Sequence, residues 1–323
     1  MSGRSATRRA NPRATSEHAR AIRFPRVALG PARAMTGKER RWLHPRGPVK
    51  IFERTVDRVA SRYIYPRLFG IWSPYSWQLP RRLEVAEAII RPAAWPAAMP
   101  ALSVLVVTDI HVGPFLLPQV LADVLAELMR LQPDLVVIGG DLVSADDAEL
   151  DPFLEALAPL ARAPLGAWFA MGNHEYFTPR PEGVAERLDT IGVATLRNRT
   201  VTIAHGGASF RLGGLDDWAI GAPDWDALCA EGAPDLLVSH NPDAFYEATS
   251  RGIGLVVSGH THGGQIRFPG GPPMVRQSRY CLDEGHMTFG DGQLVVSRGL
   301  GVSNLPWRLG VRPEALLLTI VPA

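Results

Sequence analysis

Cysteine is scarce in this chain, which has only Cys229 and Cys281 among 323 residues. The two lie far apart, so the sequence favours neither a disulfide framework nor thiolate ligation of a metal, and it fits a reducing compartment. Long hydrophobic runs are missing as well, because no apolar stretch reaches the ~18 residues that a membrane-spanning helix needs. An apolar content of 46% and a charged content of 20% are ordinary for a globular protein with a core.

Acidic residues are nearly absent from the first quarter of the chain. Residues 1–82 hold 19 Lys and Arg against 4 Asp and Glu, whereas the remainder holds 15 against 28. The basic character therefore belongs to an N-terminal extension and not to the main domain. Residues 1–47 are rich in Arg, Ala and Pro with little apolar periodicity, which predicts a disordered basic tail.

Residues 48–66 show a helical pattern, with apolar side chains three or four residues apart. Basic residues occupy much of the opposite face, and an aromatic stretch with Trp72, Tyr75 and Trp77 follows. Two interpretations stay open for the segment 48–82: a helix packed on the main domain, or an amphipathic anchor on the membrane surface. We expect the main domain to span residues 83–323. The apolar positions are Val49, Phe52, Val56, Val59 and Tyr63.

The main domain alternates short apolar runs with helical patterns. The runs at 103–108, 134–140 and 167–171 read as buried strands, and helical patterns at 118–131 and 151–162 separate them. This alternation predicts an α/β sheet covered by helices. A hairpin with a Gly-Gly turn is expected at 200–214, and further strands at 236–239, 255–258, 293–297 and 315–321.

Five of the apolar runs are followed by side chains that can bind metal. In open α/β sheets ligands bind at the carboxyl ends of strands, so these residues should converge on one rim. Oxygen and imidazole ligands suit Mn²⁺, Fe²⁺ and Zn²⁺. Seven such ligands are too many for one ion that keeps an open position, and they suit two ions bridged by a carboxylate, an arrangement for phosphoester hydrolysis. The seven are Asp109, His111, Asp141, Asn173, His240, His260 and His262, and His174 stands directly after Asn173.

The stretch "GHTHGG" at 259–264 places two of these histidines one residue apart among glycines. Alternate residues of an extended segment point the same way, so both rings could aim at one spot. Glycines on either side allow close approach of the backbone or a ligand.

The motifs "DIH", "GD", "GNHE", "SHNPD" and "GHTH" follow one another in an order that resembles the calcineurin-like metallophosphoesterases, over residues 83 to 323. The stretches "GHTHGGQIRFP" and "VSRGLGVSNLPWRLGVRPE" look like a bacterial phosphodiesterase subgroup, whose relatives include UDP-diacylglucosamine hydrolases. Members of that subgroup often carry a membrane anchor or export signal, and this chain departs from them in having no spanning helix.

The resemblance implies a four-layer α-β-β-α sandwich and a role for each motif residue. It implies two divalent ions, a water between them that attacks phosphorus, and Asp141 as the bridging ligand. His174 would stabilise the phosphoryl oxygens or protonate the leaving oxygen. The first ion would be held by Asp109, His111 and His262, and the second by Asn173, His240 and His260.

The expected function is hydrolysis of a phosphodiester or pyrophosphate bond, with a membrane-associated lipid as the candidate substrate. The alternatives are a soluble phosphatase or nuclease, and a nucleic-acid-binding protein that uses the basic tail. The metal-binding set and the acidic main domain argue against nucleic acid as the partner. Arg298, Asn304 and Arg308 are candidates for substrate binding because an Arg can fork onto a phosphate. We expect a cytoplasmic protein, with peripheral contact at the inner face of an anionic membrane as the open alternative.

Overall fold

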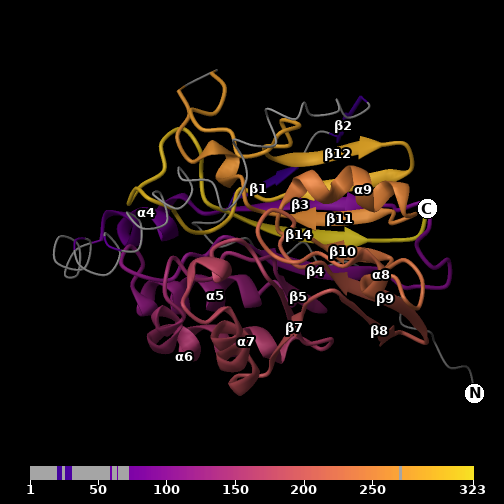
Figure 1. The fold of residues 1–323 in the computed structure, drawn as a ribbon, viewed down its shortest axis with the longest axis horizontal. Helices are drawn as coiled ribbons and strands as arrows, with labels where there is room; N and C mark the ends of the chain where they lie inside the picture. Colours follow the sequence, from indigo (N-terminus) through magenta and orange to yellow (C-terminus); the bar gives the residue numbers. More distant parts are fainter. Residues whose placement is uncertain (1–19, 24–25, 31–58, 60–63, 65–72, 269–270) are drawn as a thin grey trace, which may run out of the picture.

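The computed structural model describes residues 20–23, 26–30, 59, 64, 73–268 and 271–323 (Figure 1). Two seven-stranded sheets form the centre of the fold. The first sheet has the order β1 (Arg20–Arg23), β3 (Glu84–Ile90), β14 (Glu314–Ile320), β4 (Leu102–Val107), β5 (Leu135–Ile138), β6 (Ala167–Ala170), β7 (Val193–Leu196). The second has the order β2 (Arg26–Ala28), β12 (Gly285–Phe289), β13 (Gly292–Val296), β11 (Leu255–Ser258), β10 (Leu236–Val238), β9 (Ala208–Gly214), β8 (Arg199–His205).

Three buried apolar clusters separate four layers. Alternate residues of a strand face opposite sides, so Leu105 and Val107 of β4 belong to one cluster and Val104 and Val106 to the next. The first cluster lies under α5 (Pro118–Met129), α6 (Leu154–Leu157) and α7 (Pro181–Thr190), and the second lies between the sheets. The third lies under α8 (Trp225–Leu228) and α9 (Phe245–Ser250). In Figure 1, α5, α6 and α7 gather on the side opposite α9. The expected α-β-β-α sandwich is therefore confirmed.

The helix expected at 151–162 is broken into shorter pieces. A 3₁₀ segment at Asp147–Phe153 precedes α6, and another at Ala158–Arg162 follows it. Pro152 lies inside the first 3₁₀ segment and Pro159 near the start of the second. Proline has no backbone N–H to donate within a helix, so a continuous α-helix is not formed here.

Strand β14 lies in the middle of the first sheet, between β3 and β4. It runs parallel to β3 and antiparallel to β4. Because of that opposite direction, the loop leading into β14 lies at the carboxyl end of β4. There the backbone N–H groups of Leu300 and Gly301 donate to the carbonyls of Thr108 and Asp109, at 2.9 and 2.6 Å.

The tail 1–47, expected to be disordered, contains two short strands at sheet edges. Strand β1 pairs in parallel with β3, and β2 pairs in parallel with β12. The prediction of disorder is not met for these residues, since backbone pairing at a sheet edge needs no apolar pattern in the sequence. The rest of the tail, and nearly all of the amphipathic segment 48–66, lie outside the described residues.

Helix α4 (Pro74–Arg82) packs on the sandwich, although it precedes the expected domain boundary at residue 83. Tyr75 and Leu79 are fully buried in the first apolar cluster, and the Tyr75 hydroxyl donates to the carbonyl of Leu300. Trp77 remains 59% exposed on the same helix. No helix in the described ranges is both long enough and apolar enough to cross a bilayer.

Candidate metal centre

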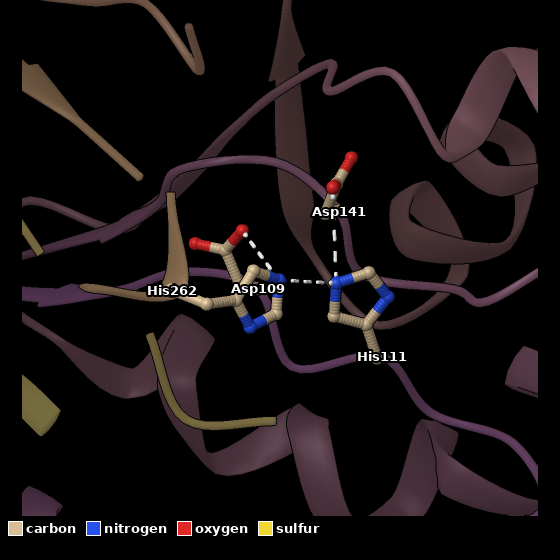
Figure 2. Close-up of side chains that lie close together, drawn as sticks. All are labelled: Asp109, His111, Asp141 and His262. Carbon is tan, nitrogen blue, oxygen red and sulfur yellow. Dashed lines mark hydrogen bonds and ion pairs between the residues drawn. The ribbon is translucent and has the colours of Figure 1, made fainter. Parts of the chain in front are cut away.

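Eight side chains of the motifs converge from both sheets. Those after β4, β5 and β6 belong to the first sheet, and those after β10 and β11 belong to the second. Seven of the eight are buried, and His260 is half-buried. Figure 2 shows four of them directed toward one point. The set is Asp109, His111, Asp141, Asn173, His174, His240, His260 and His262.

The backbone at five of these residues is left-handed. The φ angle is 50° at Asp109, 47° at His111, 50° at Asp141, 72° at His260 and 53° at His262. Residues other than glycine rarely adopt this region, and when they do, the strain tends to mark a functional site. The tight turns after the strands thus aim the side chains at one place at the expense of backbone strain.

The first donor group consists of Asp109, His111, Asp141 and His262, whose ligand atoms all lie within 4.8 Å of one another. Nε2 of His111 lies 3.0 Å from Nε2 of His262 (Figure 2). The latter is 3.4 Å from Oδ1 of Asp109, and the former is 3.7 Å from Oδ2 of Asp141. Two imidazole nitrogens facing each other between two carboxylates form a group able to bind a divalent cation.

The second donor group consists of Asp141, His240 and His260, again within 4.8 Å. Nε2 of His240 lies 3.1 Å from Oδ2 of Asp141. Nδ1 of His240 donates to the carbonyl of Gly139 at 2.8 Å, which fixes the orientation of the ring. Oδ1 of Asn173, after β6, is buried without a hydrogen-bond partner among the described residues. Such an oxygen fits a cation ligand, since buried polar atoms are otherwise hydrogen-bonded.

Burial dominates the electrostatics of the first donor group. Burial, followed by the nearby His174, holds the pKa of His111 well below its ordinary value. Burial and His111 do the same to the pKa of His262, so both rings stay neutral and keep a lone pair. Burial raises the pKa of Asp109 to about 6. A cation would offset the cost of desolvating that carboxylate.

The pair of Asp141 and His240 behaves differently. Burial acts against the charged form of each, but the attraction between carboxylate and imidazolium outweighs it. The pKa of Asp141 is therefore held well below its ordinary value, and the pKa of His240 lies well above. Asp141 keeps its negative charge at the point where the two donor groups meet.

His174 lies beside both donor groups and belongs to neither. Its Nδ1 donates to the carbonyl of Ser144 at 2.6 Å, and its Nε2 lies 4.0 Å from Oδ2 of Asp141. Its backbone N–H donates to Oδ1 of Asp141 at 2.8 Å. The hydrogen bond at Nδ1 thus orients the ring so that Nε2 faces the donor groups.

Glu175 organises the centre, although no role was inferred for it from the sequence. This buried carboxylate accepts from the backbone N–H groups of Gly172, Leu142 and Asp141, at 2.6, 2.7 and 3.0 Å. It thereby ties the loop after β6 to the loop after β5. Burial, followed by the charge of Asp141, raises the pKa of Glu175 to about 7. Its place in "GNHE", directly after two motif residues, was the available signal.

Asp217, near the start of the loop after β9, has one carboxylate oxygen in a turn and the other buried. Its Oδ1 accepts from the backbone N–H groups of Ala219 and Ile220, which is a turn role. Its Oδ2 is buried without a hydrogen-bond partner within the described part of the chain. Burial raises the pKa of Asp217 to about 6, and the carboxylate in turn helps to raise the pKa of His240.

Of the three residues suggested for substrate binding, two arginines contact other groups of the protein and the asparagine lies at the surface. The Arg298 guanidinium is paired with Glu314 and Glu84, through Nη2 at 2.6 and 2.8 Å. Arg308 is 1% exposed, and its guanidinium donates to the carbonyls of Gly301 and His262. Asn304 is exposed. These contacts leave phosphate binding by Arg298 and Arg308 without support, because their donors already serve the protein.

Comparison with known proteins gives a consistent result. Residues 102–264, which include all eight converging residues, match the family model of the calcineurin-like phosphoesterases. The chain is 29% identical over 250 residues to the uncharacterized metallophosphoesterase YkuE of Bacillus subtilis, covering 75% of this chain and 86% of that protein. It is 33% identical over 229 residues to the phosphodiesterase YaeI of Escherichia coli, covering 68% and 82%.

A vertebrate protein is similar too. The chain is 32% identical over 256 residues to a protein of Bos taurus named transmembrane protein with metallophosphoesterase domain, covering 71% of this chain. The match spans 55% of that protein, so the chain corresponds to about half of its length.

Proposed function

The chain belongs to the calcineurin-like phosphoesterase family, and on that premise we propose that it hydrolyses a phosphodiester or pyrophosphate bond with two divalent metal ions. The observation that carries the proposal is the position of Asp141, which belongs to both donor groups. A carboxylate shared by two adjoining sets of ligands suits a pair of ions that act on one phosphoryl group.

The proposed assignment gives each residue one role. Asp109, His111 and His262 hold the first ion, Asn173, His240 and His260 hold the second, and Asp141 bridges them. When bound, such ions supply the positive charge that a phosphoester needs for attack by water. Mn²⁺, Fe²⁺ and Zn²⁺ match the oxygen and imidazole donors.

His174 is the proposed acid–base residue. Since its Nδ1 donates to the Ser144 carbonyl, Nε2 is the atom that can hold a proton for the leaving oxygen. In the same position the ring could stabilise a phosphoryl oxygen by donating a hydrogen bond. Either role keeps His174 out of the ligand set, as its position beside both donor groups suggests.

The proposed substrate is a phosphoester at a membrane surface, where a lipid headgroup carries the bond. Support comes from the basic extension, with 19 Lys and Arg against 4 acidic residues in 1–82. The phosphodiesterase name of the related YaeI protein supports a diester bond.

Hydrolysis of bis-p-nitrophenyl phosphate tests the proposal. The purified chain should lose activity after dialysis against EDTA and regain it with Mn²⁺, Fe²⁺ or Zn²⁺, at close to two ions per chain. The variant Asp226→Asn is a control that should keep wild-type activity, since this carboxylate is exposed and belongs to neither donor group. Full activity with one ion per chain, or activity that survives complete chelation, would contradict the two-ion proposal.

A panel of substrates tests the proposal that the hydrolysed bond belongs to a membrane lipid. Nucleoside-diphosphate lipids, phospholipids, cyclic nucleotides and phosphomonoesters should be compared at equal concentration. The proposal expects turnover of a lipid diester or pyrophosphate. A preference for soluble monoesters would contradict the lipid assignment while leaving the two-ion centre standing.

A further inference from the structure

Large apolar side chains are exposed on three adjoining segments beside the metal centre. They account for seven of the twelve large apolar side chains that are exposed in the described ranges, with exposures between 41% and 63%. The apolar rim, as we call this set, consists of Trp77 of α4, Phe268, Met274 and Val275 of the segment 265–276, and Leu305, Trp307 and Leu309 of the segment 303–309.

Hydrogen bonds from glutamine side chains to backbone groups join the three segments. Nε2 of Gln265 donates to the carbonyls of Leu305 and Trp307, at 3.2 and 3.3 Å. Nε2 of Gln78, next to Trp77 in α4, donates to the carbonyl of Arg308 at 2.9 Å, and Oε1 of Gln78 accepts from the Arg308 N–H at 2.8 Å. The apolar rim therefore consists of neighbouring elements and not of scattered side chains.

The apolar rim is also connected to the metal centre. Gln265 follows His262 by three residues. From the other segment, Arg308 donates to the carbonyl of His262 at 3.0 Å. A surface that docks on the apolar rim would thus come close to the donor groups.

The charged residues of the three segments themselves are all basic, although acids of neighbouring segments pair with several of them. The stretches 73–82, 265–276 and 303–312 contain six Arg and no Asp or Glu. Arg267 and Arg276 pair with Glu284 and Asp283 of a neighbouring segment. Arg81 is exposed, and its guanidinium lies 4.7 Å from the centroid of the Trp77 ring.

The basic extension leads into the domain at this place. Residues 1–72 hold 17 Lys and Arg against 4 acidic residues, and they precede α4 directly. An anionic surface near the apolar rim would therefore attract both the exposed arginine of α4 and the chain before it.

We propose that the apolar rim is a membrane-docking face that seats the enzyme on an anionic bilayer. Trp77 and Trp307 lie at the level of the headgroups, where amphipathic rings are favoured, and the exposed Arg81 contacts lipid phosphate. A second copy of the chain is a poorer occupant, because it would bring Arg81 and the basic extension of one copy against those of the other. The idea that docking brings the phosphoester bond of a lipid to the metal centre rests on the proposed function. Docking itself does not depend on hydrolysis.

Sedimentation of the full-length, metal-loaded chain with vesicles tests the proposal. Vesicles of phosphatidylcholine with phosphatidylglycerol should bind the protein, and vesicles of phosphatidylcholine alone should bind it far less. The double variant Phe268→Ala and Trp307→Ala should weaken binding about tenfold or more, since two apolar side chains no longer enter the bilayer. Ile89→Ala is the matched control, because Ile89 is 64% exposed on β3, outside the apolar rim, and should leave binding unchanged.

Hydrolysis of bis-p-nitrophenyl phosphate by the same double variant separates docking from chemistry. Unchanged turnover of this soluble substrate with weakened vesicle binding is the expected result. Vesicle binding equal to that of the wild type in the double variant would overturn the docking face. Wild-type protein that stays in the supernatant with anionic vesicles at low salt would also overturn it. The same holds if the wild type forms a dimer in sedimentation velocity and the double variant is a monomer.

Discussion

Nη2 of Arg308 lies 3.2 Å from Nδ1 of His262, on the side of the ring away from the donor group. Nε and Nη1 of Arg308 donate to the carbonyls of Gly301 and His262, and Nη2 donates to that of Arg298. Burial lowers the pKa of Arg308, and the negative charge of Asp109 opposes that effect. The buried guanidinium of Arg308 thus holds His262, a member of the first donor group, in place.

The variant Arg308→Met should destabilise the protein by several kcal/mol. It leaves the carbonyls of Gly301 and Arg298 without the Arg308 donor, and each unsatisfied buried group costs about 1–3 kcal/mol, whereas the carbonyl of His262 keeps the N–H of Gln265. Urea denaturation of chelator-treated protein measures the change without a contribution from metal. Arg130→Met is the control, because this exposed arginine should shift stability by no more than about 0.5 kcal/mol. Equal effects of the two variants would contradict the role given to Arg308.

The variant Asp141→Asn should lose metal from both donor groups. The amide keeps the shape and an acceptor for the His174 N–H, but it removes the charge that the two groups share. We expect fewer than two ions per chain by elemental analysis, and activity near background. Two tightly bound ions together with normal turnover would show that Asp141 is not the bridging ligand.

The variant His174→Ala should keep its metal and lose rate, roughly 10²–10⁴-fold if the ring acts as a general acid. The loss should shrink for esters with good leaving groups such as p-nitrophenol, which need little protonation. Comparing kcat for a series of leaving groups measures this. An equal loss along the series indicates charge stabilisation instead, and loss of an ion would make His174 a ligand.

The variant Glu149→Gln should flatten the dependence of stability on pH. Burial raises the pKa of Glu149 from its ordinary 4.5 to about 7, although the N–H groups of Ser144 and Ala145 donate to it. Between these pH values the folded protein holds a proton that the unfolded chain has released. The contribution of Glu149 is therefore full below about pH 4.5 and is lost as pH rises toward 7.

The measurement is the difference in free energy of unfolding between wild type and Glu149→Gln from pH 4.5 to 8. The wild type should lose stability relative to the variant as pH rises through this window, and the difference should level off above it. A difference that does not change with pH would show that Glu149 titrates alike in the folded and unfolded chains.

The strands of the main domain that carry the motifs were predictable, because each is an apolar run that ends in polar residues. Strand β3 was missed, since it begins with the charged Glu84 and Glu87 interrupts its apolar pattern. That carboxylate accepts from Arg298 at 2.8 Å and lies 3.3 Å from Arg312, both more than 200 residues away. A local pattern does not reveal a partner so distant along the chain.

The residues of the candidate site were likewise predictable only in part. The residues with recognisable spacing were found from the sequence, and the structure brings all eight together. The supporting residues were not found, because Glu175 and Arg308 act through backbone groups of other loops. Such contacts depend on where the loops meet, which the spacing of the motifs does not reveal.

The central place of β14 bears on when the protein can become active during its synthesis. This strand is formed by residues 314–320, yet it lies between β3 and β4 and so joins the earliest core strands of the domain. Until residues 314–320 have been synthesised and have joined the sheet, β4 lacks its neighbour on one side, and Asp109 lacks the loop that donates to its carbonyl. The ligands that follow β4 should therefore reach their final arrangement only once β14 is in place.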